Sequence, residues 1–173
     1  MKRTKILLLG AFGVLGGCSG SGLTSLNWRA PADVLTYTAS TRVVPYPYAT
    51  NHAPAVEATI VITNNTASSI TFNYSRGICG GLELTAFVTP DFSGDPVWRQ
   101  SSAGLECSAV GYAPSPLGPG QSVQIVAYAD VSSVLAGGGR SGTYYFRAIV
   151  RVGGGDIRNS AVPVPAGSVQ LTQ

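Results

Sequence analysis

The side chains of this sequence with the strongest nucleophilic or metal-binding chemistry are three cysteines and one histidine: Cys18, Cys79, Cys107 and His52. A catalytic serine or cysteine needs a base beside it, and a zinc ion takes about four Cys, His or carboxylate ligands. His52 follows Asn51 in a Pro/Tyr-rich segment that lacks the signals of a nucleophile elbow. We therefore expect no catalytic residue, no metal site and no cofactor, and we predict that the protein is not an enzyme.

The acidic residues offer no other catalytic constellation. Asp91 and Asp95 flank a turn at Ser93-Gly94, where aspartate is favoured because its side chain bonds to nearby backbone N–H groups. The turn lacks the third acidic ligand and the closing glutamate of a calcium loop. We interpret both aspartates as turn residues.

The first eighteen residues have the organisation of an export signal. Lys2, Arg3 and Lys5 form a positive start, and an apolar stretch over residues 6–15 follows. That stretch is too short for a membrane-spanning helix, which needs about 20 residues. A signal peptide over residues 1–17 that is cleaved during export is therefore predicted.

The end of this signal, Leu15-Gly16-Gly17-Cys18, resembles the bacterial lipobox. The resemblance implies that a diacylglycerol is transferred to the Cys18 thiol and that Cys18, with a further N-linked acyl chain, becomes the mature N-terminus. Several acyl chains would anchor the protein stably, since each buried methylene contributes about 0.8 kcal/mol. The resemblance also implies a bacterial cell-envelope protein facing outside the cytoplasm, and Ser19 favours the outer membrane if the organism has one. An ordinary secretory signal followed by a chance cysteine is the alternative.

Removal of the signal cancels the net charge of the chain. Of the eleven basic residues three lie in the signal, which leaves eight arginines against eight acidic residues. A neutral domain gives no reason to expect nucleic-acid binding. The expected partners are the membrane, through the lipid anchor, and another protein of the envelope.

Cys79 and Cys107 form an even pair once Cys18 is assigned to lipid. In a protein outside the cytoplasm such a pair predicts a disulfide. Closing the loop between them would stabilise the fold by roughly 3 to 4 kcal/mol in the chain-entropy treatment.

The rest of the sequence predicts an all-β domain over residues 33–173, joined to Cys18 by a flexible tether over residues 18–32. Apolar and polar residues alternate in short segments separated by turn residues, and no stretch of ten or more residues after residue 20 has a convincing helical period. About seven to nine strands argue for a β-sandwich. The expected strands cover 34–41, 55–63, 70–75, 82–88, 96–100, 121–129, 142–152 and 157–164.

Three local features are also predicted. The segments 55–63 and 70–75, joined through Asn64-Asn65-Thr66, are expected to form an antiparallel hairpin. Residues 131–135 are expected to form a single helical turn. The segment 157–164 is expected to end at a sheet edge because of its prolines.

Three segments between residues 56 and 152 resemble the immunoglobulin-like domain of the BsuPI intracellular proteinase inhibitor family. They are a strand, an Asn-rich turn and a strand over 59–72, the strand Val97-Trp98-Arg99, and the turn Leu117-Gly118-Pro119-Gly120 leading to Ser141-Gly142-Thr143-Tyr144. The resemblance implies an immunoglobulin-like antiparallel β-sandwich. The export signal, the cysteine pair and the 101–116 segment depart from the family, and no inhibitory residue is carried over.

These observations favour a non-catalytic, lipid-anchored envelope protein whose β-sandwich binds another protein through end loops or a strand edge. An extracytoplasmic BsuPI-like proteinase inhibitor and a structural accessory subunit of an envelope complex are the alternatives. The sequence predicts no particular binding residue, because its tyrosines and tryptophans either line a binding face or belong to the strand core.

Overall fold

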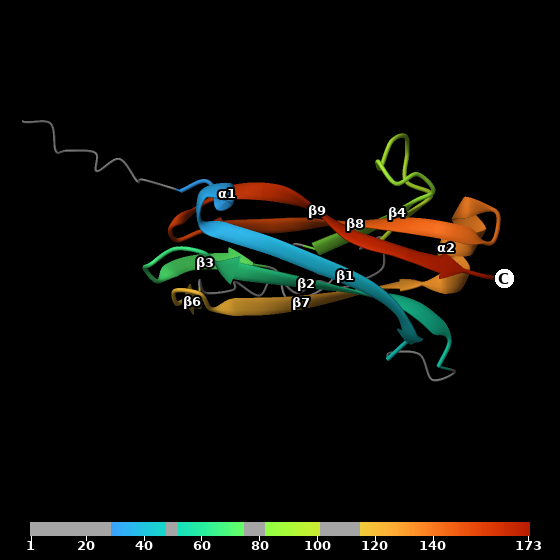
Figure 1. Ribbon diagram of the computed structural model, residues 1–173, viewed down its shortest axis with the longest axis horizontal. Helices are drawn as coiled ribbons and strands as arrows, with labels where there is room; N and C mark the ends of the chain where they lie inside the picture. The colour runs from blue at the N-terminus through green and yellow to red at the C-terminus, as the bar shows by residue number, and fades with distance from the viewer. Residues whose placement is uncertain (1–28, 48–51, 75–81, 101–114) are drawn as a thin grey trace, which may run out of the picture.

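The computed structural model describes residues 29–47, 52–74, 82–100 and 115–173, which form two antiparallel β-sheets packed face to face (Figure 1). The smaller sheet has three strands in the order β1 (Leu35–Pro45), β2 (Pro54–Asn64) and β7 (Ser122–Asp130). The larger sheet is built around β8 (Gly142–Gly154), with β9 (Ile157–Leu171) on one side. On the other side of β8 lie β4 (Leu82–Phe87), which pairs with the short β5 (Trp98–Arg99), and β3 (Ile70–Tyr74), which pairs with β6 (Ser115–Leu117).

The core lies between the two sheets and follows the alternation of the strands. In β2, the residues predicted to share one face are all buried: Val56, Ala58, Ile60 and Ile62. From the larger sheet, β8 contributes Tyr144, Phe146, Ala148 and Val150 to the same core. The pleat turns successive side chains to opposite faces, so the residues between them in β8 point away from the core.

The strand arrangement is that of an immunoglobulin-like sandwich, as predicted. The β1-β2-β7 sheet corresponds to strands A, B and E, and β4, β8 and β9 correspond to C, F and G. Tyr144, near the start of β8, donates its hydroxyl to the Arg140 carbonyl oxygen at 2.6 Å. This bond to a residue four positions upstream matches the tyrosine corner of immunoglobulin-like domains.

The predicted hairpin between residues 55–63 and 70–75 is wrong. Both neighbours of β2 are already taken by β1 and β7, and β3 crosses to the larger sheet, where it pairs with β6 and β8. The turn is therefore an arch between sheets, and Asn64 holds it. The Asn64 side chain is fully buried and donates to the carbonyl oxygens of Ser68 and Leu117, both at 2.8 Å.

The last strand also differs from the prediction, because β9 continues past its prolines to Leu171. Pro163 and Pro165 lie opposite Ile149 and Arg147 of β8. A proline has no N–H to donate, so the ladder bonds must come from the alternating residues, such as Val162 and Val164. The two prolines thus remove donors from the outer edge of β9 and do not interrupt its pairing with β8.

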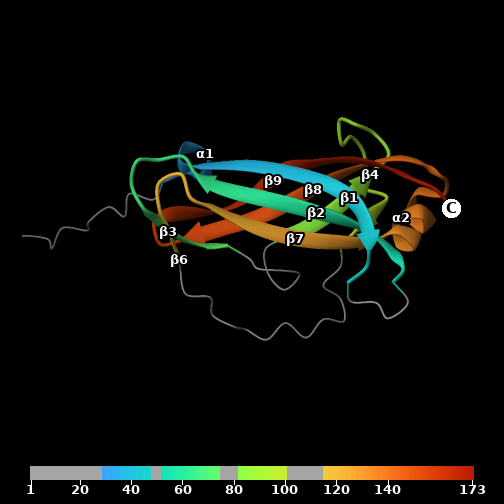
Figure 2. The same cartoon turned by 60° about the horizontal axis from the view of Figure 1, so that its bottom comes forward.

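Two helices of the described residues flank the sheets. α1 (Pro31–Val34) precedes β1, and α2 (Val131–Gly138) joins β7 to β8 at the opposite end of the sandwich (Figures 1 and 2). α2 is longer than the predicted helical turn because both of its ends are capped. The Asp130 carboxylate accepts from the Ser133 N–H, and Gly139 closes the helix in the left-handed conformation with φ 73°.

Arg29, the first described residue, already pairs with the sandwich. The Arg29 N–H donates to the Asp156 carbonyl oxygen at 3.0 Å, and the Arg158 N–H donates to the Arg29 carbonyl oxygen at 3.0 Å. Within the described ranges, no helix has the length and hydropathy needed to cross a bilayer.

Candidate functional site

The three cysteines singled out in the sequence, Cys18, Cys79 and Cys107, lie outside the described residues. His52 is exposed, with a backbone φ of 51°. In the parts of the chain that the structure describes, no three His, Cys, Asp or Glu side chains come close enough to hold a metal ion.

The two aspartates of the 88–97 loop are exposed, and Asp91 acts as the turn residue that we expected. Its carboxylate accepts from the Ser93 N–H at 3.1 Å. Hydrogen bonds from Ser93 lower the pKa of Asp91 below its usual value. Neither Asp91 nor Asp95 forms an ion pair with an arginine of the described residues.

The candidate site is the solvent-facing side of the larger sheet. Thr85 of β4 pairs with Arg99 of β5 and with Arg147 of β8, and directly opposed residues of neighbouring strands point to the same face. Glu83 lies two residues from Thr85 and Arg151 four from Arg147, so both share that face. Two phenylalanines complete what we call the arginine face, which consists of Glu83, Phe87, Phe92, Arg99, Arg147 and Arg151.

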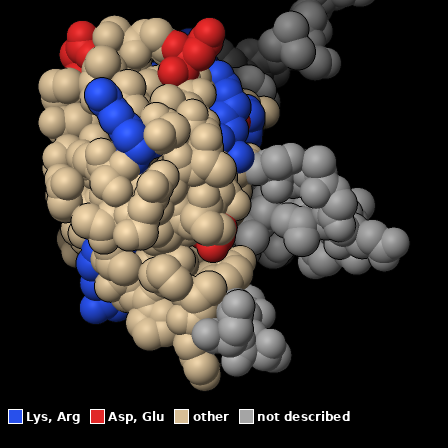
Figure 3. Space-filling view, turned by 90° about the vertical axis from the view of Figure 1, so that its right-hand side faces the viewer, with Lys and Arg blue, Asp and Glu red and all other residues tan. Residues whose placement is uncertain are grey.

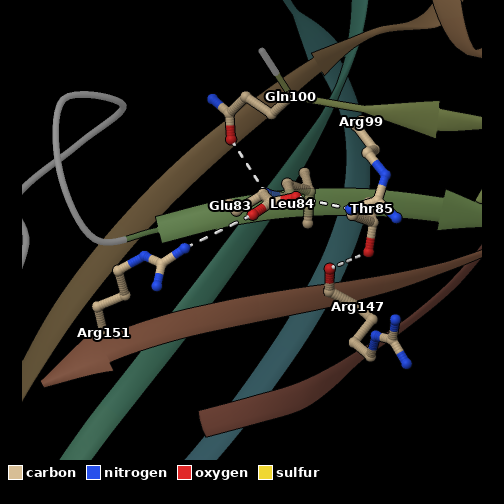
Figure 4. A network of polar contacts seen from close by, with 7 residues as sticks. All are labelled: Glu83, Leu84, Thr85, Arg99, Gln100, Arg147 and Arg151. Atoms are coloured by element: carbon tan, nitrogen blue, oxygen red, sulfur yellow. Dashed lines mark hydrogen bonds and ion pairs between the residues drawn. The ribbon is translucent and has the colours of Figure 1, made fainter. Parts of the chain in front are cut away.

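Glu83 is shared by two of these arginines (Figure 4). Arg99 Nη1 lies 3.2 Å from Glu83 Oε1, and Arg151 Nη2 lies 4.0 Å from Glu83 Oε2. The arginine side chains are 60% and 58% exposed. Solvent-exposed ion pairs of this kind contribute about 0 to 1 kcal/mol to stability. They therefore add little to the fold, while the face carries more positive than negative charge.

The Arg147 guanidinium packs against two aromatic rings that contact each other. Its Cζ lies 4.6 Å from the centroid of Phe87 and 5.6 Å from that of Phe92, and the two rings meet edge to face with centroids 5.5 Å apart. A guanidinium over an aromatic face is attracted by the ring quadrupole by roughly 0.5 to 2 kcal/mol. Phe87 is 1% exposed although it points away from the core, so this part of the outer face is covered.

No carboxylate of the described residues is paired with the Arg147 guanidinium. Within the described residues its side chain makes no hydrogen bond or ion pair, and its Nε is buried without a partner. Buried polar atoms usually have a partner, because an unsatisfied one costs about 1 to 3 kcal/mol. Arg147 is therefore the residue of this face whose bonding capacity the fold leaves unused.

Phe92 reaches this position at a conformational cost. Its backbone φ is 57°, in the left-handed region that a bulky L-residue adopts at about 1 to 2 kcal/mol. The Phe92 N–H donates to the Thr89 carbonyl oxygen at 3.2 Å, which fixes the turn. Strained residues of this kind cluster at binding and catalytic sites.

The strands beneath the arginine face are tied together on both sides of β4. Thr85 Oγ1 donates to the Arg147 carbonyl oxygen at 2.9 Å (Figure 4). On the other side, the Leu84 N–H donates to Gln100 Oε1 at 3.2 Å, and the Gln100 N–H donates to the Leu84 carbonyl oxygen at 2.8 Å. These bonds fix the backbones that carry the three arginines.

The smaller sheet contrasts with this arrangement. On its outer face Arg42 is paired with Glu57, with Nη2 2.7 Å from Glu57 Oε1, and the Tyr128 hydroxyl donates to the other oxygen of that carboxylate at 3.1 Å. The neighbouring outward residues are uncharged: Thr36, Thr38, Ser40, Thr59, Val61 and Thr63. Figure 3 shows the α2 end of the sandwich, where basic and acidic groups lie at several places on a mostly uncharged surface. Among the described residues Arg29, Arg140 and Arg158 also make no ion pair, so Arg147 is set apart by its contact with Phe87 and Phe92 rather than by unpaired charge alone.

No family model matches the sequence, and no curated protein matches it. Solved structures that resemble the chain include the crystal structure of a proposed ApaA protein from Bordetella pertussis, at 14% sequence identity and a TM-score of 0.39. The similarity covers 80% of this chain and 93% of that one. At this identity and TM-score the similarity supports no statement about function, and the resemblance to the BsuPI family stays a prediction.

Proposed function

We propose that this protein is a non-catalytic, lipid-anchored component of the bacterial envelope whose β-sandwich binds another protein through the arginine face. The observation that carries the proposal is Arg147, a guanidinium that packs against Phe87 and Phe92 and has no hydrogen-bond or ion-pair partner among the described residues. Arginine and aromatic side chains are enriched in protein interfaces, and arginine is among the residues that dominate binding energy there.

The lipid anchor is supported by the sequence from Met1 to Cys18, and the position of the domain is compatible with it. Arg29 is bonded to the sandwich, and the eleven residues 18–28 before it have a maximum reach of about 40 Å. The chain enters the sandwich at the α1 end, whereas α2 and the 88–97 loop lie toward the other end (Figures 1 and 2). The arginine face can therefore meet a partner in the aqueous space beside the membrane.

A pull-down from detergent-solubilised membranes with the anchored chain as bait, followed by mass spectrometry, tests the proposal. Wild type is compared with an Arg99→Gln/Arg151→Gln variant, which changes two exposed side chains, and with Arg42→Gln on the other sheet. We expect a discrete protein with wild type and with Arg42→Gln, and a clear loss with the double variant. Equal recovery with all three baits, or no specific protein with any of them, would contradict the proposal.

The anchor and the mode of action have separate checks. A Cys18→Ser variant should lose lipid labelling and move to the soluble fraction, and unchanged membrane attachment would refute the anchor. If the captured partner is a protease and the purified protein inhibits it at nanomolar concentration, the mode of action is proteinase inhibition and not binding alone.

A further inference from the structure

We infer that Arg147 is the receptor for a side-chain carboxylate of the partner protein, so that the partner presents an aspartate or glutamate to the arginine face. This inference rests on the proposed function and names the chemistry of its central contact. It follows from the geometry of the guanidinium, from the charges around it and from its place on the sandwich.

The geometry leaves one side of the guanidinium available. Nε is buried and has no partner. The two Nη atoms are not among the buried atoms that lack a partner, so their N–H groups remain open to solvent or to a ligand. Two parallel N–H groups of an arginine match the two oxygens of a carboxylate in a bidentate contact. Because Phe87 and Phe92 already hold the guanidinium, less side-chain entropy is lost when such a contact forms.

The charges around Arg147 favour a carboxylate from outside the chain. Glu83 contacts Arg99 and Arg151 and makes no ion pair with Arg147. The residues paired with Arg147 on either side, Thr85 and Pro165, are uncharged. An incoming carboxylate therefore meets no competing acid on these strands, and the positive charge of the face steers it toward Arg147.

The place of Arg147 favours a protein ligand over lipid phosphate. Arg147 lies seven residues along β8 from Gly154, which pairs with Ile157, and Ile157 lies beside Arg29, the described residue nearest to the lipid anchor in the sequence. At 3.3 Å per residue this separates Arg147 from the Arg29 end of the sandwich by roughly 23 Å. Against a phosphorylated side chain of the partner, a single unpaired guanidinium matches the single charge of a carboxylate better than the higher charge of a phosphate monoester.

Phe92 gives independent support for a binding role. A glycine or asparagine at this turn would adopt φ 57° with less strain than phenylalanine. The ring that is kept there packs on Phe87 and flanks the Arg147 guanidinium. The strain thus positions an aromatic wall of the proposed carboxylate site.

The test uses the full-length protein in detergent micelles and an array of immobilised ten-residue peptides. Each peptide is made in three forms with glutamate, glutamine or phosphoserine at the central position, and phosphatidylglycerol vesicles form a further arm. The proteins are wild type, Arg147→Gln, Arg147→Lys, Phe92→Gly and the matched control Arg42→Gln. Melting temperatures of all five establish that each variant is folded.

Wild type and Arg42→Gln should prefer glutamate peptides over their glutamine forms. Arg147→Gln should reduce this binding by about tenfold to a hundredfold, the effect of losing a hydrogen bond to a charged group. Arg147→Lys should fall between the two, because an ammonium keeps the charge but cannot make the bidentate contact. Phe92→Gly should weaken binding while the protein stays folded, which keeps the test valid if Arg147→Gln does not fold.

Equal binding of glutamate peptides by wild type and Arg147→Gln would overturn the inference, as would equal binding of the glutamate and glutamine forms by wild type. Binding confined to phosphoserine peptides or to vesicles would overturn the choice of carboxylate. Failure of the proposed function is distinguishable, since the pull-down then recovers no partner at all. A partner recovered equally by wild type and Arg147→Gln refutes only the role of Arg147.

Discussion

The side chain of Asn64 should be the strongest single determinant of the arch between the two sheets. Asn64 ends β2 on the smaller sheet, and its amide nitrogen donates to carbonyl oxygens of Ser68, Leu117 and Gly118 at 2.8, 2.8 and 3.1 Å. Its Oδ1 accepts from the N–H and the hydroxyl of Thr66 at 2.9 and 2.7 Å. Asn64→Ala removes all five contacts at a residue with 0% exposure.

The size of the loss follows from these contacts. A hydrogen bond within a protein contributes about 1 kcal/mol net, and a buried group left without a partner costs about 1 to 3 kcal/mol. Ser68 and Thr66 lie near the surface and can bind water instead, so the penalty falls mainly on the Leu117 carbonyl, which keeps only a long bond from the Ser69 hydroxyl at 3.5 Å. We expect Asn64→Ala to lower the free energy of unfolding by about 3 kcal/mol, which corresponds to roughly 10 °C in melting temperature for a domain of this size.

Urea denaturation followed by tryptophan fluorescence measures this loss, with Asn65→Ala as the matched control. Asn65 is exposed, so its substitution should change the free energy of unfolding by less than about 0.5 kcal/mol. Asn64→Asp keeps the acceptors but not the amide donors, and its stability should recover partly on acidification because a protonated carboxyl can donate one bond. A loss below about 1 kcal/mol for Asn64→Ala would refute the assignment of the arch to this side chain.

Three further predictions concern other sites. Burial raises the pKa of Tyr37 to about 12, and its hydroxyl has no hydrogen-bond partner among the described residues. Tyr37→Phe should therefore be neutral or stabilising at pH 7, and only wild type should lose stability as the pH rises from 10 toward 12. An equal loss of stability at alkaline pH in the variant would contradict this. Burial would raise the pKa of Asp130, but hydrogen bonds from Ser132 and Ser133 outweigh it and lower that pKa. Its cap should therefore stabilise α2 at neutral pH and be lost as the pH falls below about 4. Asp130→Ala should cost about 1 kcal/mol at pH 7 in thermal melts and less at pH 3, and a pH-independent cost would count against the cap. Phe92→Gly should relieve about 1 kcal/mol of backbone strain, so it should destabilise the fold less than removal of an aromatic ring from an unstrained position. Partner binding should fall in the same variant. Unchanged binding would show that the strained Phe92 has no role in binding.

The strands were largely predictable because their signal is local. The alternation in β2 and β8 places Ile60 and Phe146 in the core without any knowledge of the fold. The arch was not predictable, because nothing in Asn64-Asn65-Thr66 distinguishes a hairpin from a crossing between sheets. Tertiary contacts decide between the two. The Asn64 side chain donates to the carbonyl oxygens of Leu117 and Gly118, and both edges of β2 are already paired, with β1 and β7.

Only part of the arginine face could be predicted from the sequence. The period of two in β8 places Arg147 and Arg151 on one side of a strand, opposite to Tyr144 and Phe146. Their partners come from β4 and the loop after it, and the pairing of Glu83 and Phe87 with β8 depends on contacts more than 50 residues apart. The unpaired state of Arg147 is therefore a property of the folded sheet, which no local pattern indicates.

The central claim is that the arginine face meets a protein partner in the envelope, and photo-crosslinking in living cells tests it most directly. A benzophenone amino acid is placed at Pro165, which is exposed and lies opposite Arg147, or at Thr38, which is exposed on the outer face of the smaller sheet. Irradiation should yield one discrete crosslinked protein from position 165, none from position 38, and a loss of the product from position 165 when Arg147→Gln is added. The same crosslinked products from both positions, or none from position 165, would contradict the account.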